Sequence, residues 1–555
     1  MILEFNLHYK SSSLVYEKIF ILALEVCNLH GKVKKEHFDL KLYVESDDLE
    51  KLEEFATYFS SQLPHSIFLH KYYANIVDEI PEDEYILPSQ EKPPLPFCPK
   101  CLGEVMDSEN SNYYNIFTEC DVCGYGISGE NRSYKSEFEK IANDIKDGKT
   151  IELNTFYGKY YVATPSKICN SISFDIIVYD LATIQKYANL EKYELKALAS
   201  FEKPLVKLKK KLNFSVDFED VETDLIRFKL PDDFILHLLM EELHKIGIDT
   251  VFITKDQIES QEKILLVDFI DEQEPIEVVV SEKDIAIVSG SKGLAEFPIN
   301  SQEINPALGS FFSVIKEHKL NDEDIAGVYL SKEYQNNILV YGKKYGVVQY
   351  LSLNFEFSSI KNIFEQIINS DENAASLVNN YKNKFSEHFN YISEIKFENS
   401  EFNIFKLWGI VSIILDYSKS KDPFEAAQAL ENNVLSFLGK KGPRIDYKLQ
   451  NKDKKVYLDP LMTIRTAMSF RLAGVDPLML SYGVIESFLE FITNELDELK
   501  QSMNTTAITV SGSLLSNKHI FSKMSKEISI NHDIYFNNEL PVDGINMFYG
   551  GSSLE

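Results

Sequence analysis

The sequence predicts a multidomain α+β protein, and three features of the chain support this prediction. Its 555 residues correspond to roughly three to four domains of ordinary size. Strand-like and helix-like patterns follow one another along most of its length. Two Cys-x-x-Cys pairs, 18 residues apart, form a small module between a short N-terminal region and a much longer remainder.

The composition is that of ordinary globular material with a strong acidic excess. Hydrophobic residues make up 44% of the chain and charged residues 26%, which suffices for several cores, and the formal net charge is −29. Such a charge excludes nonspecific nucleic-acid binding, which needs a basic surface, and it opposes docking on anionic lipid. A basic protein partner remains compatible with it.

The sequence shows neither the pattern of an N-terminal secretory signal nor that of a membrane-spanning helix. The N-terminus, MILEFNLHYK, lacks the basic and apolar regions of a secretory signal. The most apolar stretch, Phe402–Tyr417, contains Lys406 and Asp416 and falls short of the ~18 apolar residues of a membrane span. We therefore expect a cytoplasmic protein without membrane or nucleic-acid partners.

The first predicted domain covers residues 1–78. Its patterns predict strand, helix, strand, helix and strand over Ile2–Tyr9, Leu14–Leu29, Phe38–Val44, Asp47–Phe59 and His65–Tyr73. Asp47 or Asp48 is the expected N-cap of the second helix. With one further strand, which the sequence marks poorly, the layout is β-α-β-β-α-β.

The second predicted domain covers residues 79–139. It opens with the proline-rich, acidic stretch EIPEDEYILPSQEKPPLPF, which predicts an extended linker over 79–97. The two cysteine pairs follow, and their members are Cys98, Cys101, Cys120 and Cys123. Two pairs at this spacing favour one zinc ion held by four thiolates, a closed site that serves folding and not catalysis. Redox-active pairs or four buried free thiols are the alternatives.

The third predicted domain covers residues 140–303 and follows a helix expected at Ser133–Lys146. Strands are expected at Thr150–Leu153, Tyr160–Ala163, Phe174–Tyr179, Leu205–Leu208, Thr250–Ile253, Lys263–Phe269 and Ile276–Val280. Helices are expected at Leu181–Ala188 and Phe234–Leu243. The second of these carries His237 and His244, whose seven-residue spacing favours a surface helix over a metal site.

The fourth predicted domain covers residues 304–555. Strands are expected at Gly327–Leu330, Ile338–Tyr341, Val347–Leu353, Thr506–Val510 and Ile534–Phe536. Helices are expected at Ile360–Ile368, Ile404–Tyr417, Asp422–Gly439, Pro460–Leu472, Pro477–Lys500 and Leu514–Ser525. Trp408 is expected in the core, and Gly439–Asp446 is predicted to be a loop because it lacks the GxxxxGK[ST] pattern.

The cysteine module carries a family resemblance. CPKCLGEVMDSENSNYYNIFTECDVCGYGI resembles one of the paired zinc fingers of the HypF-type carbamoyltransferases, which mature nickel-iron hydrogenases. That family has an acylphosphatase-like domain of ferredoxin type, two such fingers, a YrdC-like α/β domain, and an actin-like (ASKHA) domain of the threonylcarbamoyl-transferase type. The domain order fits nearly the full chain, with a single finger, and the resemblance identifies the protein as a divergent member.

The resemblance also shows which of the family's chemical groups are missing. The family's acylphosphatase domain cradles phosphate with an arginine, whereas the matching stretch, Ser11–Glu17, has none, and Glu17 would repel phosphate. The remaining candidates for holding phosphate there are Lys10, Lys34 and Lys35. In the middle domain, the basic segment that binds nucleotide and carbamoyl phosphate is absent between Ala163 and Phe174, so tight ATP binding should be lost.

The C-terminal domain keeps part of the family's pattern. Its metal-binding histidines have no counterpart in Ser400–Trp408. A strand-to-helix turn and an Asp-Gly turn do match the family's nucleotide- and metal-binding loops, and their residues are Ser511, Gly512, Ser513, Asn517, Asp543 and Gly544. Such a turn presents backbone N–H groups to phosphate. The alternative is that Gly512 merely permits a tight turn and Asp543 caps a helix.

Two functional hypotheses follow from this pattern. In the first, the protein is a reduced, non-catalytic relative of HypF, an accessory scaffold that binds hydrogenase maturation factors or hydrogenase precursor subunits. In the second, it is an active carbamoyltransferase that uses carbamoyl phosphate and ATP to carbamoylate a partner cysteine for cyanide ligand synthesis. The resemblance implies structural zinc in both cases and ATP only in the second. A third hypothesis, a chance zinc ribbon in an unrelated protein, predicts a C-terminal half without an actin-like fold.

Overall fold

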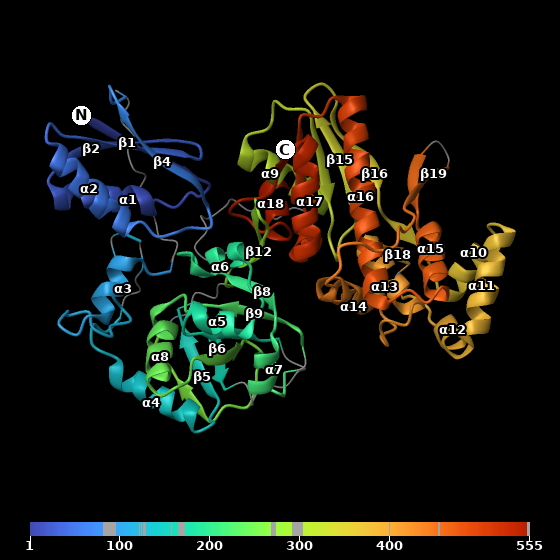
Figure 1. Cartoon of the computed structure of the whole chain (residues 1–555), viewed down its shortest axis with the longest axis horizontal. Helices are drawn as coiled ribbons and strands as arrows, with labels where there is room; N and C mark the ends of the chain where they lie inside the picture. Colours follow the sequence, from blue (N-terminus) through green and yellow to red (C-terminus); the bar gives the residue numbers. More distant parts are fainter. Residues whose placement is uncertain are drawn as a thin grey trace. The chain divides into compact units, whose positions relative to one another are not determined.

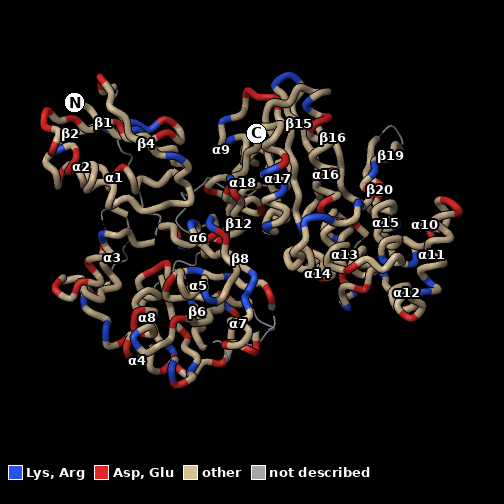
Figure 2. The backbone as a smooth tube through the Cα atoms, viewed as in Figure 1, with Lys and Arg blue, Asp and Glu red and all other residues tan. Residues whose placement is uncertain are grey.

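The computed structural model describes residues 1–81, 96–120, 122–123, 125, 129–156, 158–164, 173–221, 223–267, 274–290, 304–398, 400–452 and 455–551. The chain forms two compact units. The first comprises Met1–Val278 and Ser289–Glu296, and the second comprises Val279–Val288 and Phe297–Glu555. Basic and acidic residues are interspersed along the backbone of both units (Figure 2).

The N-terminal part of the first unit is a four-stranded antiparallel sheet with two helices (Figure 1). The strand order is β2-β3-β1-β4, and the chain runs β-α-β-β-α-β. The elements are β1 (Ile2–Tyr9), α1 (Val15–Cys27), β2 (His30–Glu36), β3 (Asp39–Glu45), α2 (Leu49–Gln62) and β4 (Leu69–Val77). The strand that the sequence marks poorly is β2, because its HGKVKKE pattern is dominated by charge.

Aromatic side chains fill the space between this sheet and its helices. The ring of Phe5 on β1 lies 5.0 Å from that of Phe59 on α2, between centroids, and Phe20 of α1 contacts the same ring at 5.5 Å. The predicted cap Asp48 accepts a hydrogen bond from the Glu50 N–H at 3.0 Å, which fixes the start of α2.

The rest of the first unit is built on a mixed sheet with the strand order β11-β5-β6-β10-β7-β9-β8-β12. Its strands are β5 (Ile151–Thr155), β6 (Gly158–Ala163), β7 (Asp175–Val178), β8 (Leu205–Lys209), β9 (Leu225–Lys229), β10 (Thr250–Thr254), β11 (Glu262–Ile264) and β12 (Glu277–Val280). Its helices are α3 (Pro99–Met106), α4 (Lys135–Lys146), α5 (Leu181–Tyr187), α6 (Lys192–Ala199), α7 (Leu212–Asp217) and α8 (Phe234–Lys245). The predicted linker over 79–97 lies mostly outside the described residues, as does the end of the predicted strand Lys263–Phe269.

The second unit is built on a seven-stranded mixed sheet with the order β19-β20-β16-β15-β14-β21-β22 (Figure 1). The strands are β14 (Ile325–Tyr329), β15 (Asn337–Gly342), β16 (Gly346–Ser352), β19 (Lys448–Lys452), β20 (Lys455–Asp459), β21 (Ala507–Ser511) and β22 (Asp533–Tyr535), with a separate pair β17 (Phe355–Glu356) and β18 (Glu401–Phe402). The helices are α9 (Pro306–His318), α10 (Ile360–Ile368), α11 (Glu372–Lys384), α12 (Ser386–Ser393), α13 (Ile404–Ile414), α14 (Pro423–Ser436), α15 (Pro460–Leu472), α16 (Pro477–Met503), α17 (Lys518–Asn531) and α18 (Ile545–Gly551). The strand β13 (Ile285–Ser289) lies at the sequence boundary of the two units.

Apolar side chains bury both faces of this sheet. Along β14, Ala326 and Val328 belong to a large core shared with α13, α16 and α17, whereas Ile325 and Tyr329 pack with α9. Since side chains alternate along a strand, these two sets lie on opposite faces. Trp408 of α13 is fully buried in the larger core, which confirms the prediction.

Three predicted elements differ from the structure. The strand expected at His65–Tyr73 is β4, shifted towards the C-terminus, because the residues before it turn inward and Ile67 binds a buried carboxylate through its N–H. The single helix expected at Leu514–Ser525 is a 3-10 turn followed by α17. The predicted surface helix, α8, is largely buried, since apolar residues lie on most of its circumference. Among the described residues, no helix has the length and apolar character needed to cross a membrane.

Candidate functional site

The four predicted cysteines converge on one buried point. Their Sγ atoms are 3.7 Å apart for Cys98 and Cys101, 3.7 Å for Cys98 and Cys120, and 3.8 Å for Cys101 and Cys123. All of them lie within 4.8 Å of one another. Thiolates bound at ~2.3 Å around a tetrahedral zinc ion lie about 3.8 Å apart, whereas disulfide sulfurs lie about 2.05 Å apart. The arrangement therefore fits one tetrahedral ion, and the four cysteines can hold a metal.

A short hydrogen-bonded segment positions each of the two cysteine pairs. Cys98 is the N-cap of α3, Pro99 is the first helical residue, and the Cys98 N–H donates to Cys101 Sγ at 3.1 Å. In the second pair, the Cys120 N–H donates to the Tyr125 carbonyl at 2.7 Å and closes the turn. Hydrogen bonds among the four sulfurs lower the pKa values of Cys98 and Cys120 and raise those of Cys101 and Cys123, so that without an ion two of the thiols share protons with the other two.

The cysteine module packs against α8. Phe97 stacks on Phe234 with 4.6 Å between ring centroids, and the Phe234 N–H donates to the Tyr125 hydroxyl at 3.1 Å. The Tyr114 hydroxyl donates to the Glu242 carboxylate. The folded module therefore contributes part of the packing of this helix, so a metal that holds the module together also stabilises α8.

His237 on α8 gives this contact a pH dependence. Its ring lies 5.1 Å from that of Phe97, and burial, with the Lys203 ammonium nearby, lowers the pKa of His237 from 6.5 to about 4. Between these values the unfolded chain binds a proton that the folded protein does not, so the stability is full above pH 6.5 and falls as the pH falls towards 4. At about pH 5.5, protonation of His237 in the unfolded chain should lower the free energy of unfolding by about 1 kcal/mol, and we expect His237→Phe to abolish this loss.

Thermal unfolding of the wild type and of His237→Phe, each near neutral and at mildly acidic pH, measures this effect. The midpoint of the variant should shift less between the two conditions than that of the wild type. Equal shifts would contradict the assignment. The two histidines of α8 lie beside different carboxylates, His237 at 3.7 Å from Glu241 and His244 at 2.6 Å from Asp249.

Internal hydrogen bonds saturate Asp543, a predicted nucleotide-site residue. Its Oδ1 accepts from the Tyr329 hydroxyl at 2.7 Å and the Gly544 N–H at 3.0 Å. Its Oδ2 accepts from the Ser331 hydroxyl at 2.7 Å and the Ser513 N–H at 2.8 Å. Burial and the neighbouring carboxylate raise the pKa of Tyr329, so its hydroxyl stays protonated and donates. Since each carboxylate oxygen offers two lone pairs, the protein itself occupies the positions that a metal ion would use.

The backbone donors of the neighbouring turn are occupied in the same way. Besides the Ser513 N–H, which binds Asp543, the next N–H groups of the turn donate to main-chain carbonyls. These bonds join Gly512 to Val542 at 2.6 Å, Leu514 to Leu330 at 2.9 Å and Leu515 to Gly512 at 3.1 Å. An anion site at a strand-to-helix turn needs such groups to be available. The turn is therefore closed on itself, without donors for phosphate between residues 512 and 515.

The remaining predicted residues of this region have structural roles. Gly512 has a φ of 109°, and a Cβ there would lie 2.2 Å from the Leu330 carbonyl oxygen, so the position requires glycine. Asn517 caps α17 and places its Nδ2 at 3.4 Å from Glu431. Glu431 also accepts from Lys332 Nζ at 2.8 Å, so an internal cation lies beside the turn. No sequence pattern pointed to Lys332 or Glu431, because both residues lie far from the turn along the chain.

Two of the three N-terminal phosphate candidates, Lys34 and Lys35, are engaged in ion pairs. Glu17 is fully buried, and Lys35 Nζ lies 3.0 Å from its Oε1 and 3.3 Å from the Ser11 carbonyl oxygen. Burial raises the pKa of Glu17, and the Lys35 ammonium opposes this rise. Lys34 pairs with Glu36 at 2.9 Å. An ammonium that already neutralises a buried carboxylate offers no net charge to phosphate.

We expect Lys35→Ala to lower the free energy of unfolding by about 3 kcal/mol, because it leaves the Glu17 carboxylate buried without its partner. The double variant Glu17→Leu/Lys35→Met removes both charges and should have nearly wild-type stability. Urea unfolding curves of the three proteins test this coupling. If the double variant lost as much stability as the single one, the ion pair would not be the cause.

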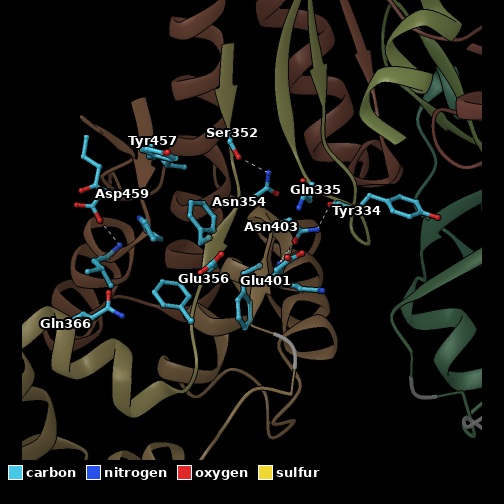
Figure 3. A pocket seen from close by; sticks show the side chains of 18 of the residues that line it. Tyr334, Gln335, Ser352, Asn354, Glu356, Gln366, Glu401, Asn403, Tyr457 and Asp459 are labelled. Atoms are coloured by element: carbon cyan, nitrogen blue, oxygen red, sulfur yellow. Dashed lines mark hydrogen bonds between the residues drawn. The ribbon is translucent and has the colours of Figure 1, made fainter. Parts of the chain in front are cut away.

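A cavity of about 830 Å³ in the second unit lies beside β17, β18 and β20 (Figure 3). Its charged side chains are mostly acidic, and the β17–β18 register places Glu356 directly opposite Glu401, with Asp459 across the cavity and Lys406 as a cation. The residues predicted to bind nucleotide do not line it. A surplus of carboxylates repels phosphate, so the lining of this cavity opposes the binding of ATP.

A smaller cavity of about 220 Å³ lies in the first unit, beside β7 and β9. The cations in its lining are Arg227 and Lys255. Arg227 Nε lies 2.6 Å from Asp175 Oδ1, and Arg227 Nη1 lies 3.6 Å from Glu277. Two carboxylates thus neutralise the guanidinium. The segment between Ala163 and Phe174, where the resemblance expects the missing basic residues, lies largely outside the described residues.

Comparisons with known proteins show that this chain is similar in fold to HypF. No protein-family model matches the chain. Protein HydE of Wolinella succinogenes is 26% identical over 423 residues, which cover 75% of each chain. Full-length HypF in its phosphate- and nucleotide-bound form superposes with a TM-score of 0.66 at 13% identity, over 99% of this chain and 97% of that one. HypF of T. kodakarensis superposes with a TM-score of 0.71 at 12% identity, over 100% and 98%. The chain thus has a mixed α/β multidomain fold similar to HypF, as the resemblance predicts.

Proposed function

We propose that the protein is a hydrogenase maturation factor that has kept the HypF architecture and acts as a non-catalytic scaffold in nickel-iron hydrogenase assembly. Similarity to HypF over nearly the full chain supports the maturation role. The observation that carries the loss of catalysis is the internal saturation of Asp543 and of the turn at residues 512–515. Hydrogenase maturation factors or hydrogenase precursor subunits are the proposed partners.

Within this proposal, the chain has four domains. Residues 1–78 form an acylphosphatase-like domain, 79–139 a linker with a single zinc finger, 140–303 a YrdC-like domain and 304–555 an actin-like domain. The β-α-β-β-α-β order of the first sheet supports the first assignment, and the two-sided burial of the seven-stranded sheet is compatible with the last. The spacing of the four sulfurs supports zinc as the structural ion of Cys98, Cys101, Cys120 and Cys123.

The C-terminal residues that resemble a nucleotide site have a structural role in this proposal. Ser511, Gly512, Ser513, Asn517, Asp543 and Gly544 hold two turns together, where an enzyme of this architecture would hold ATP and metal. The same residues would carry the competing function, an active carbamoyltransferase. For that function, Asp543 has to exchange protein donors for a metal ion, and the turn has to release its N–H groups.

Carbamoyl-phosphate-dependent exchange of pyrophosphate into ATP separates the two functions. We expect no exchange by the purified full-length protein loaded with zinc. Exchange that Asp543→Ala abolishes would overturn the scaffold and support the active enzyme. The maturation role is tested independently, by affinity capture of the tagged chain from its own cells. Capture should enrich hydrogenase subunits or maturation factors, and their absence under conditions of hydrogenase synthesis would contradict the role.

A further inference from the structure

The two edges of the N-terminal sheet differ in how they are protected against pairing with another strand. The edge strand β2 has the sequence HGKVKKE, and its lysines oppose the addition of a strand. The opposite edge strand, β4, is nine residues long, contains no proline and has Lys71 as its single lysine. It exposes Tyr72 by 74%, Ile76 by 68% and Tyr73 by 51%. A long, exposed and partly apolar edge is a template for strand addition.

The face of the sheet that carries the helices is uncovered at β4. Phe5, which packs on α2, is paired with Ala74 in the β1–β4 ladder. Since opposite residues of a ladder point to the same face and side chains alternate along a strand, Tyr72, Ala74 and Ile76 lie on the helix-bearing face. All three are nevertheless exposed. The apolar face of the sheet therefore extends beyond the cover that α1 and α2 provide.

We propose that β4 pairs antiparallel with β4 of a second copy of this chain, so that two four-stranded sheets join into one across a two-fold axis. We identify a second copy of this chain as the partner because the sequence of β4 is self-complementary about Ala74. With Ala74 opposite its own equivalent, Tyr72 faces Ile76 of the second copy, an aromatic–aliphatic pair that occurs twice. A small side chain then lies on the axis, where the two copies approach most closely.

The charges of β4 and its flanks fit the same register. The basic residues His70 and Lys71 lie at the start of the strand, and the acidic residues Asp78 and Glu79 follow its end. In an antiparallel pair, each start meets the other copy's end, so that His70 faces Asp78 of the second copy and Lys71 lies diagonal to Glu79 of the second copy. A parallel pair would instead place like charges together. This even register also puts the helices of both copies on one face, which joins their exposed apolar strips.

Sedimentation equilibrium of the full-length protein over a range of concentrations tests the proposal. We expect a monomer–dimer equilibrium. Ile76→Lys should raise the dissociation constant at least about tenfold, because the lysine faces Tyr72 twice across the axis. Val26→Lys is the matched control: it also replaces an aliphatic residue that is more than half exposed, but on α1, and it should leave the equilibrium unchanged.

Cross-linking tests the register. Directly opposite residues of an antiparallel pair have Cα atoms about 4.5–5.5 Å apart, which a disulfide can span. Mild oxidation of Ala74→Cys should therefore give a covalent dimer, whereas Lys71→Cys, whose equivalent lies six positions away in the ladder, should not. A chain that stays monomeric, a dimer that Ile76→Lys leaves unchanged, or a dimer that Ala74→Cys does not cross-link would overturn the proposal. This test is independent of the proposed function.

Discussion

Replacing Cys98 with serine is expected to release the bound metal ion and unfold the cysteine module. Structural zinc sites contribute about 10–16 kcal/mol of apparent binding free energy, and this energy is coupled to folding. Cys98 is both a ligand and the N-cap of α3, so its loss affects the ion and the helix that carries Cys101. The packing of Phe97 and Tyr114 on α8 should loosen as a consequence.

Metal analysis of the purified protein and limited proteolysis measure the two parts of this prediction. The wild type should contain one zinc per chain, and Cys98→Ser should contain none and be cleaved within the module. Cys27→Ser is the control, since Cys27 is a partly exposed cysteine at the end of α1, apart from the cluster. Full zinc content in Cys98→Ser would contradict the four-cysteine site.

The cysteine site could be predicted from the sequence because its geometry is local. Each Cys-x-x-Cys loop fixes two sulfurs through one short turn, and the 18 residues between the pairs fold into a compact connection. Many of the strands and helices were predictable for the same reason, because hydrophobic periodicity acts over a few residues. The helices α9 and α11 and the strands β9, β19 and β20 were not predicted. The shift of β4 arises from a tertiary contact instead: Glu202, far along the chain, accepts from the Ile67 N–H and the Ser66 hydroxyl.

The closure of the C-terminal turns was not predictable from local patterns. Ser331 and Asp543 are more than 200 positions apart, and their bond becomes visible only when β14 and β21 lie side by side in one sheet. The sequence shows a serine-glycine turn and an aspartate, which suit a phosphate site and a closed structural site equally well. The choice between them depends on whether the N–H groups are occupied, and that is a property of the tertiary fold. The same holds for the pair of Glu17 with Lys35, which joins α1 to β2.

Replacing Asp543 with alanine is expected to lower the stability of the second unit by about 3 kcal/mol, because several donors lose their acceptor and buried unpaired donors each cost about 1–3 kcal/mol. The hydroxyls of Tyr329 and Ser331 and the Ser513 N–H are the groups affected most directly. Asp322→Ala is the matched control. Asp322 forms a surface ion pair with Lys343 and its side chain is 83% exposed, so its loss should have little effect.

A comparison of the wild type with Asp543→Ala distinguishes a structural aspartate from a metal ligand. In a working nucleotide site, Asp543→Ala would weaken the binding of magnesium–ATP and relieve the repulsion that an unpaired carboxylate creates in the absence of metal. In the closed site seen here, the carboxylate already has four protein donors, so its removal destabilises the protein without nucleotide. We therefore expect chemical unfolding of the wild type to be insensitive to magnesium–ATP and the variant to be less stable with or without it. Stabilisation of the wild type by magnesium–ATP, lost in Asp543→Ala, would show that the turns open to bind nucleotide.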